Sequence, residues 1–556
     1  MRGQLIHSLT TAIALVACAP LAAQSYQGGG GDAASSQDEE EGDGDRRTGR
    51  RVTVQPYVEA SQIVTAQLSP GDDVVTYTQV AAGVDAAIQG RNSGGSVSLR
   101  YEHNFGWDDA ADSDTISGVA RGYMTIVPQA VTLEAGALAS RTTVTNDGTN
   151  VFTGQNNLDN TSQVYSAYVG PNVQTRVDDV EITGNYRLGY TRVESPDFVA
   201  APGQSADVFD ESVSHSAQAR AGFAPDTYLP VGLGVGAGYF REDVNNLDQR
   251  VEDAYVRADV TIPVAPTLAI VGGVGYENVE VSSRDAVRDA AGDPVIGPDG
   301  RFITDESSPR QIAFEADGLI WDVGVLWRPS RRTTLAAGFG HRYDSETFYG
   351  SFTWQPNNRT SLSINAYDGI SGFGGRLNNS LSALPADFQV IRDPVTGNIV
   401  GCVNAVGGGS CLDGLLGSVR SSVFRSRGVA ANFSRQVGRY TAGLSAGYDR
   451  RTFIGAPGTV LALSDGVTDE NWFIAGAVSG AVGRDGNFTV STYANWIDSG
   501  FGGSDALALG SSAAYNHAVT RKLSARAAVA LNYLDSDLST EDLKTASALV
   551  GLRYDF

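Results

Sequence analysis

Hydrophobic and polar positions alternate with a period of two along almost the whole chain after Val52. In the stretch 523–533 every odd position is apolar, with small or polar residues between them. In the stretch 231–239 four glycines alternate with apolar residues, and in 97–107 apolar residues alternate with Ser98, Arg100, Glu102 and Asn104. This period predicts β-strands that each have one apolar face and one polar face.

The connections between these strands decide between a soluble sandwich and a membrane barrel. Short connections are expected at 90–95, 128–129, 178–179, 264–267, 329–332, 356–359, 437–439, 483–486 and 519–521. Between them lie longer ones, at 146–161, 194–214, 282–310, 369–425, 453–468 and 536–542. Short periplasmic turns alternating with long outer loops are typical of outer-membrane barrels. A soluble sandwich has no reason to place its long loops at every second connection.

We therefore expect an all-β fold, a transmembrane antiparallel up-and-down β-barrel over residues 52–556, with about 22 strands and a range of roughly 18 to 24. The weakest hairpin is 341–352. In lipid no backbone group can stay unpaired, so the last strand must pair with the first. Pro56 and the pair Gly170-Pro171 fall inside expected strands, where bulges or strand ends are predicted.

The C-terminal strand carries the most specific pattern of the chain. Apolar residues occupy every second position of it: Ala546, Ala548, Val550, Leu552, Tyr554 and Phe556. This run resembles the sorting signal of bacterial outer-membrane proteins, at Val550, Leu552, Tyr554 and Phe556. The resemblance implies insertion by the barrel-assembly machinery, contact with outer-membrane lipid and location in the bacterial outer membrane. Trp107, Trp327, Trp354, Trp472 and Trp496 lie near expected strand ends and suit interfacial girdles.

The N-terminus resembles an export signal. Met1-Arg2, the apolar stretch 9–16 and the small residues 17–24 predict a signal peptide over 1–23. A lipidated Cys18 is the alternative, because Leu15-Val16-Ala17-Cys18 resembles a lipobox. No apolar stretch is long enough for a transmembrane helix, which needs about 20 residues. Residues 24–51 are rich in Gly, Ser and charge, and are expected to form a disordered periplasmic segment that is too short for a transporter plug.

Composition and charge exclude several classes of protein. The 556 residues carry a net charge of −23, which argues against a nucleic-acid partner. Beyond Cys18 only Cys402 and Cys411 remain, and in an exported protein they are disulfide candidates. Two free thiols are the alternative, and metal binding is disfavoured because no histidine lies near. We find no metal, cofactor or catalytic site, since the segments around 293–301 and 393–398 match turn chemistry better than a calcium loop.

A barrel of this size encloses a lumen too wide for side chains to fill. The alternation turns six arginines toward it: Arg100, Arg121, Arg187, Arg220, Arg257 and Arg526. Four acidic residues face the same way: Glu102, Glu181, Asp253 and Asp259. Such charges either set ion selectivity or merely pair across strands. Residues 369–425 form the longest loop and are the best candidate for a constriction.

These features favour a non-enzymatic, porin-like channel for passive passage of small hydrophilic solutes. The opening 54–60, followed by a strand from Val74, resembles large barrels of which some are associated with exopolysaccharide export, although Ser61-Gln62-Ile63 stands where those proteins carry a Tyr-Asp-Asn-type motif. That resemblance implies polysaccharide export or a structural role as the alternative. A membrane-embedded hydrolase is disfavoured, because the histidines lie far apart in the sequence with no serine or acid partner at a recognisable spacing.

Overall fold

The computed structural model describes residues 51–107, 112–143, 161–194, 208–386, 388–397, 399–404, 410–411, 419–501, 505–537 and 541–556. The expected signal peptide, Cys18 and residues 24–50 lie outside the described residues. The first strand begins at Arg51, one residue before the expected start of the barrel.

The described chain forms a single ring of 22 antiparallel strands, which confirms the predicted fold class and strand number. The strands of the ring are β1 (Arg51–Ser69), β2 (Val74–Gln89), β3 (Ser93–Trp107), β4 (Ser113–Val127), β5 (Val131–Thr143), β6 (Thr161–Val177), β7 (Val180–Glu194), β8 (Glu211–Phe223), β9 (Gly232–Val244), β10 (Gln249–Ala265), β11 (Leu268–Ser283), β12 (Gln311–Ser330), β13 (Thr333–Arg342), β14 (Ser345–Asn357), β15 (Thr360–Ser371), β19 (Phe424–Val437), β20 (Tyr440–Phe453), β21 (Thr468–Val482), β22 (Gly486–Ser499), β23 (Ala506–Ala518), β24 (Leu523–Ser536) and β25 (Leu543–Asp555).

The remaining elements lie in the connections. The β15–β19 loop holds helix α1 (Phe373–Ala383) and a small sheet of β16 (Gln389–Arg392), β17 (Ile399–Asn404) and β18 (Ser410–Cys411). Two short 3-10 helices, η3 (Asn246–Asp248) and η4 (Val460–Leu463), lie in other connections. No described helix has both the length and the apolar character needed to cross a bilayer.

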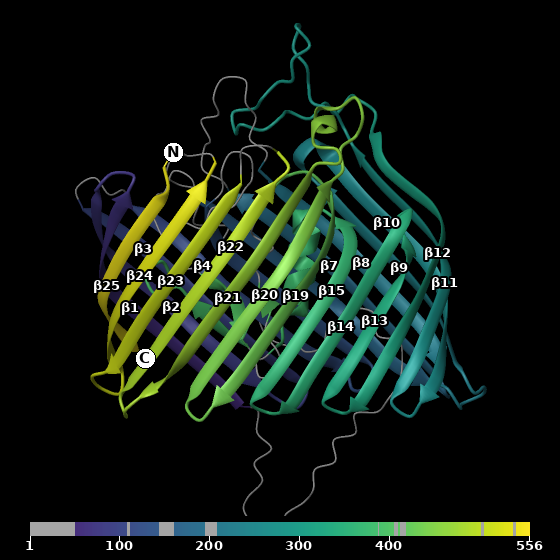
Figure 1. The fold of residues 1–556 in the computed structure, drawn as a ribbon, viewed down its shortest axis with the longest axis horizontal. Helices are drawn as coiled ribbons and strands as arrows, with labels where there is room; N and C mark the ends of the chain where they lie inside the picture. Colours follow the sequence, from purple (N-terminus) through teal and green to yellow (C-terminus); the bar gives the residue numbers. More distant parts are fainter. Residues whose placement is uncertain are drawn as a thin grey trace, which may run out of the picture.

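The ring closes as expected, because β25 pairs with β1. Their register runs from Tyr57 opposite Asp555 to Ser69 opposite Lys544, with one irregularity near Gln67. Figure 1 shows the tilted strands, the short turns along the lower rim and the long connections at the top. The lower rim is the periplasmic side if the short turns follow the usual orientation of such barrels. The C-terminus lies at this rim (Figure 1).

The strict alternation of loop lengths is wrong in detail. Three connections on the long-loop side are also tight, at 70–73, 245–248 and 343–344. In the last, Tyr343 and Asp344 both adopt positive φ, at 56° and 52°, which allows a two-residue turn between β13 and β14. The hairpin over 341–352 is therefore part of the ring, and its weak pattern did not change the strand number.

Neither proline position bulges or ends its strand. Pro56 lies just beyond the paired part of β25, whose terminal Phe556 N–H donates to the Pro56 carbonyl at 3.1 Å. Its missing N–H therefore falls at the end of the β1–β25 ladder, but Pro56 lies inside β1 and pairs with Val84 in unchanged register, so the expected bulge or strand end is wrong here. At Gly170-Pro171 the expected bulge or strand end is wrong, because β6 runs through in unchanged register and only loses these two pairs with β7. The pairing of β6 with β5 stays continuous through Pro171. The N–H that proline lacks would point toward β7, so its absence affects only the β6–β7 pairing.

Burial in the wall is inverted relative to a soluble protein. Polar residues such as Glu102, Ser117 and Thr191 are buried, whereas alternate apolar residues such as Leu99, Val550 and Leu552 are exposed. The five tryptophans expected in girdles are all exposed on the outer side. An apolar outer belt on a closed antiparallel ring is the architecture of bacterial outer-membrane barrels.

Glycines in the wall let long side chains reach across a strand. Arg257 on β10 passes over Gly273 on β11 to Asp322 on β12, and a Cβ at Gly273 would lie 2.1 Å from Arg257 Nη2. Arg220 passes over Gly234 to reach Asp259 in the same way. The alternation of glycine with apolar residues therefore has a packing cause, because any side chain at these positions would block the crossing.

Candidate functional site

The lumen is the candidate site, and the β15–β19 loop enters it. Helix α1 contacts β5, β6, β7, β8 and β15. On β7 it lies against Thr191 and Gly189, on the face opposite to the exposed Leu188 and Tyr190. Because those apolar residues face outward, α1 lies inside the ring. The loop that the sequence marked as the best candidate for a constriction thus occupies part of the lumen.

The start of α1 is anchored to the wall by one buried carboxylate. Glu242 on β9 accepts hydrogen bonds from the backbone N–H of Gly372 at 2.7 Å and of Gly375 at 2.8 Å, and from the Ser212 hydroxyl at 2.9 Å. A negative charge at this position also suits the helix dipole. A Cβ at Gly375 would lie 2.3 Å from Glu242 Oε2, so glycine is required for this approach.

Polar contacts fix the body of α1. Arg376 donates from Nη2 to Asp449 Oδ1 at 2.7 Å and to the Tyr367 hydroxyl at 2.8 Å. Burial lowers the pKa of Arg376, but Asp449 and Tyr367 together outweigh it and the net change is upward. Two residues further, Asn378 accepts from the Ser166 hydroxyl at 3.0 Å. These bonds tie the helix to opposite parts of the wall.

The apolar side of α1 completes a hydrophobic cluster inside the barrel. Phe373, Leu377, Leu381 and Leu384 are buried against wall residues that include Val164 and Val193. Phe209 and Val419, from two of the long connections, join the same cluster. The rings of Phe209 and Phe373 lie 5.2 Å apart. A buried apolar cluster of this kind stabilises the inward position of α1, since displacing the helix would expose the cluster to water.

A second anchor lies around Arg392 on β16. Its guanidinium donates to the Ser117 hydroxyl at 2.6 Å and to the Ser98 hydroxyl at 3.2 Å, both on the wall. Burial lowers the pKa of Arg392. Three residues further, Val395 packs with wall residues of β1, β2 and β23 to β25, among them Ile63 and Leu549. The loop therefore touches the wall on several sides of the lumen.

The turn at 393–397 is explained by its own hydrogen bonds. Asp393 Oδ1 accepts from the backbone N–H of Val395 at 2.9 Å and of Thr396 at 2.8 Å, and Gly397 has a φ of 69°. At the second calcium-like segment, the Gly297 N–H donates to the Arg301 carbonyl at 2.7 Å. Within the described ranges, no group of three or more His, Cys, Asp or Glu could hold a metal ion.

The two candidate disulfide cysteines lie opposite one another in the backbone. Cys402 on β17 pairs with Cys411 on β18. Directly opposed residues of antiparallel strands have Cα atoms about 4.5 to 5.5 Å apart, within the usual disulfide range of roughly 4.4 to 6.8 Å. The register is compatible with the bond, which stays a prediction.

Two of the six candidate arginines share one carboxylate. Arg100 is 3% exposed and forms ion pairs with Glu59 on β1 and Glu102 on its own strand. Arg526 Nη1 lies 3.5 Å from Glu59 Oε2. Arg553, which the sequence did not single out, reaches the same carboxylate at 3.3 Å.

The other four candidates form two pairs: Arg121 and Arg187 both contact Tyr168, and Arg220 and Arg257 share Asp259. Arg121 pairs with Glu134 at 3.2 Å. Arg220 and Arg257 meet at Asp259, at 2.6 and 3.3 Å, and Arg257 also pairs with Asp322 at 2.7 Å. Arg187 donates to Asn379 of α1 at 3.0 Å. Five of the six therefore have a carboxylate partner, and a role in ion selectivity stays a prediction.

Of the remaining acidic candidates, Asp253 forms an ion pair with Arg342 at 2.7 Å, and Glu181 accepts a hydrogen bond from Gln174 at 3.4 Å.

The sequence did not single out Glu242, Arg376 or Arg392. Helix α1 itself had a readable signal, because Phe373, Leu377, Leu381 and Leu384 follow a helical period. The sequence contains no signal for the role of Glu242, because its partners are backbone amides more than a hundred residues away.

The described histidines lie on the outward side of the strands. His103 bonds Asp114 at 2.8 Å beside the exposed Tyr101 and Phe105, and His215 bonds the Tyr186 hydroxyl at 2.8 Å. His341 and His517 follow the exposed Phe339 and Tyr515 at the same alternation. No serine is bonded to any of them among the hydrogen bonds of the described chain.

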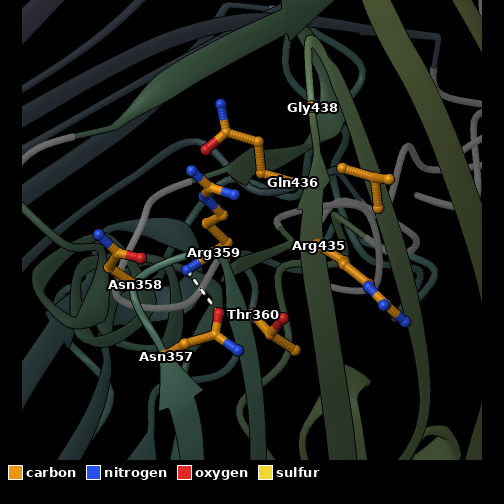
Figure 2. Close-up of a pocket in the computed structure, with 8 residues that line it drawn as sticks. Asn357, Asn358, Arg359, Thr360, Arg435, Gln436 and Gly438 are labelled. Atoms are coloured by element: carbon orange, nitrogen blue, oxygen red, sulfur yellow. Dashed lines mark hydrogen bonds between the residues drawn. The ribbon is translucent and has the colours of Figure 1, made fainter.

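A shallow surface pocket lies at the short-turn rim, between the β14–β15 and β19–β20 turns. Figure 2 shows that Arg359 and Gln436 reach to one side of β19 and Arg435 to the other. The Arg359 N–H donates to Asn357 Oδ1 at 2.9 Å, and the Gln436 N–H donates to the Arg359 carbonyl at 2.7 Å. Two guanidinium groups and several amides therefore gather at this rim.

No family model matches the chain, and no curated protein is similar to it in sequence. Among solved structures, the FrpB iron transporter from Neisseria meningitidis (F3-3 variant) is 10% identical, with 90% of this chain and 81% of that chain covered and a TM-score of 0.43. The siderophore receptor PirA from Acinetobacter baumannii is 9% identical, with 91% and 81% covered and a TM-score of 0.39. The ferric-catecholate import receptor Fiu from E. coli K12 is 9% identical, with 90% and 81% covered and a TM-score of 0.40. Likeness this low carries no information about what the chain binds.

Proposed function

We propose that this protein is an outer-membrane channel for small hydrophilic solutes, in which the β15–β19 loop restricts passage. A ring of 22 strands encloses more space than wall side chains fill. Its inner face is polar and charged, as an aqueous path requires, whereas its outer face is apolar. The observation that carries the proposal is α1, which is pinned inside the ring by Glu242, Arg376 and Asn378.

This proposal refines the open, passive pore expected from the sequence. A loop bonded to the wall on several sides narrows the path beside it, so solutes pass along the part of the lumen that α1 and β16 leave free. Along that path the arginines are paired with carboxylates, so positive and negative side chains largely cancel one another and the net electrostatic field is small. Weak ion selectivity and a size limit below that of an open barrel follow.

Planar bilayers test this directly with the refolded mature chain. We expect stable channels of modest conductance, weak selectivity between cations and anions, and partial block by neutral sugars above a size limit. A folded, heat-modifiable protein without any conductance would refute the channel and favour a structural barrel.

A carbohydrate solute is the second candidate, because tyrosines lie along the inner wall. Tyr349 passes over Gly338 to bond Asp322 at 2.7 Å, and Tyr367 passes over Gly428 to bond Asp449 at 2.9 Å. The Tyr349 ring is the candidate contact for the apolar face of a sugar, because the Arg376 guanidinium lies 4.5 Å over the centroid of the Tyr367 ring and covers it. Concentration-dependent block by maltooligosaccharides, without block by polyethylene glycol of equal size, would favour this solute class. Export of a polysaccharide stays the alternative, and such block would also support it.

A further inference from the structure

A set of basic side chains gathers along one arc of the short-turn rim. The basic rim, as we call it, consists of Arg331, Arg332, Arg359, Arg435, Arg439, Arg484, Arg521 and Lys522, all exposed. They lie in or beside the five short turns between β12 and β24. Asp485 is the only acidic residue in those turns or within three residues of them. The arc is strongly positive although the whole chain carries −23.

The basic rim differs from the other charged parts of the barrel because its charges are unpaired. Arg332 donates to the Pro356 carbonyl at 2.6 Å, and Arg439 and Lys522 lie over aromatic rings. Within the part of the chain that the structure describes, no carboxylate forms an ion pair with any of the eight. At the opposite ends of the strands, Arg241 and Arg192 have carboxylate partners at 2.7 and 3.4 Å.

The position of the basic rim points to a lipid surface. Exposed Trp327, Trp354, Tyr440 and Tyr554 lie on the same strand ends, at the edge of the apolar belt. The Lys522 ammonium lies 5.9 Å from the Tyr554 ring, and the Arg439 guanidinium 5.6 Å from the Tyr440 ring. Aromatic residues mark the level of lipid headgroups, and basic residues beside them attract anionic lipids.

The pocket of Figure 2 lies within this arc. Arg359 and Arg435 are both part of its lining but extend to opposite sides of β19, and the amide side chains of Asn357 and Asn358 lie on the side of Arg359. A guanidinium group with neighbouring amide donors, as at Arg359, suits phosphate oxygens. By contrast, the turns between β6 and β9 carry Asp178, Asp179 and Asp226, so that part of the rim repels phosphate groups.

We propose that the basic rim binds the headgroups of anionic phospholipids in the leaflet that the short turns face. An acidic segment of the chain itself, with Glu39, Glu40 and Glu41, is the other possible occupant. The apolar belt and aromatic girdle beside the arc favour lipid, because an acidic peptide would not need them. This inference depends on the membrane placement of the barrel and not on conductance, so the two can fail separately.

The test measures lipids retained by the full mature chain in neutral detergent, using native mass spectrometry. Short-chain phosphatidylglycerol and phosphatidylcholine serve as probes. The test variant is R359Q/R435Q/R439Q/R484Q, and the matched control is R192Q/R241Q/R250Q/R450Q at the opposite strand ends, which also removes four charges. Each basic residue near an anionic surface contributes roughly fivefold. We therefore expect the test variant to retain at least about tenfold less phosphatidylglycerol, with phosphatidylcholine and the control unchanged.

Three results would overturn the proposal. In the first, the heat-modifiable test variant keeps its phosphatidylglycerol, or the control loses as much. In the second, the chain binds inorganic phosphate as tightly as it binds phosphatidylglycerol at equal ionic strength, which means that the rim binds a free anion. In the third, E39Q/E40Q/E41Q in the full chain raises phosphatidylglycerol binding severalfold, which makes the acidic segment the occupant. Unchanged binding in that last variant supports lipid.

Discussion

Glu242 Oε1 on the barrel wall accepts a hydrogen bond of 2.8 Å from the backbone N–H of Gly375 at the start of α1. The residues are 133 positions apart, and this contact holds a loop helix inside the lumen. Whether the lumen is open or restricted depends on such contacts, because the ring itself would leave a wide path.

Replacing this carboxylate should loosen α1. In E242Q the side-chain amide presents fewer acceptors to Gly372 and Gly375, so the anchor loses about 1.5 to 3 kcal/mol. We expect noisier and larger single-channel currents, and faster protease cleavage within 372–423. E315Q changes an outward-facing carboxylate on β12 and should leave both unchanged. Equal currents in all three proteins would show that Glu242 does not restrain the loop.

Adding a methyl group at the helix start tests the same contact sterically. In G375A the new Cβ would meet Glu242 Oε2 at 2.3 Å and Phe240 Cζ at 2.8 Å, so α1 must shift. Overpacking of this kind costs about 1 to 3 kcal/mol. G318A is the control, because nothing lies within 4 Å of its Cβ. The free energy of unfolding in urea and the conductance should change only in G375A. A similar change in G375A and G318A would contradict close packing at Gly375.

The paired wall arginines should matter for stability more than exposed ones. Removing Arg257 leaves Asp322 buried without its bidentate partner at 2.7 Å. We expect R257Q to lower the free energy of unfolding by about 3 kcal/mol. Arg192 and Glu194 are half exposed, so R192Q should cost no more than about 1 kcal/mol. Comparable losses measured by urea unfolding in detergent would argue against a structural ion pair at Arg257.

The sequence predicted those features whose pattern lies within one element of the fold. The period of two gave the strands, and the C-terminal run ending at Phe556 gave the closing strand, because both patterns lie within single elements. The helical spacing of Phe373, Leu377 and Leu381 was equally readable. The partners of Glu242 could not be read, since ring curvature and the path of a long loop bring them together.

The cysteine prediction is checked by chemistry. Intact mass spectrometry of the unreduced chain after alkylation should show Cys402 and Cys411 unmodified, and reduction should expose both. A bond across so short a loop contributes about 2 to 3 kcal/mol to local stability. C402S/C411S should therefore make the 372–423 loop more sensitive to protease. Alkylation of both thiols without reduction would show that the pair is free.

The last strand should control assembly. Phe556 is 66% exposed, and its N–H closes the ladder onto Pro56. If its ring belongs to a signal read by the assembly machinery, F556A should lower the amount of heat-modifiable barrel in cells severalfold while the purified chain still refolds. K544Q in the same strand should behave as the parent does. Normal assembly of F556A would remove this residue from the signal.

The most direct measurement compares single-channel conductance of the parent chain with that of a variant whose residues 373–397 are replaced by a short Gly-Ser linker. If the inward loop restricts the lumen, the parent gives small currents, and the variant gives severalfold larger ones that pass larger neutral sugars. Equal conductance and equal sugar cut-off in two folded proteins would contradict the restriction.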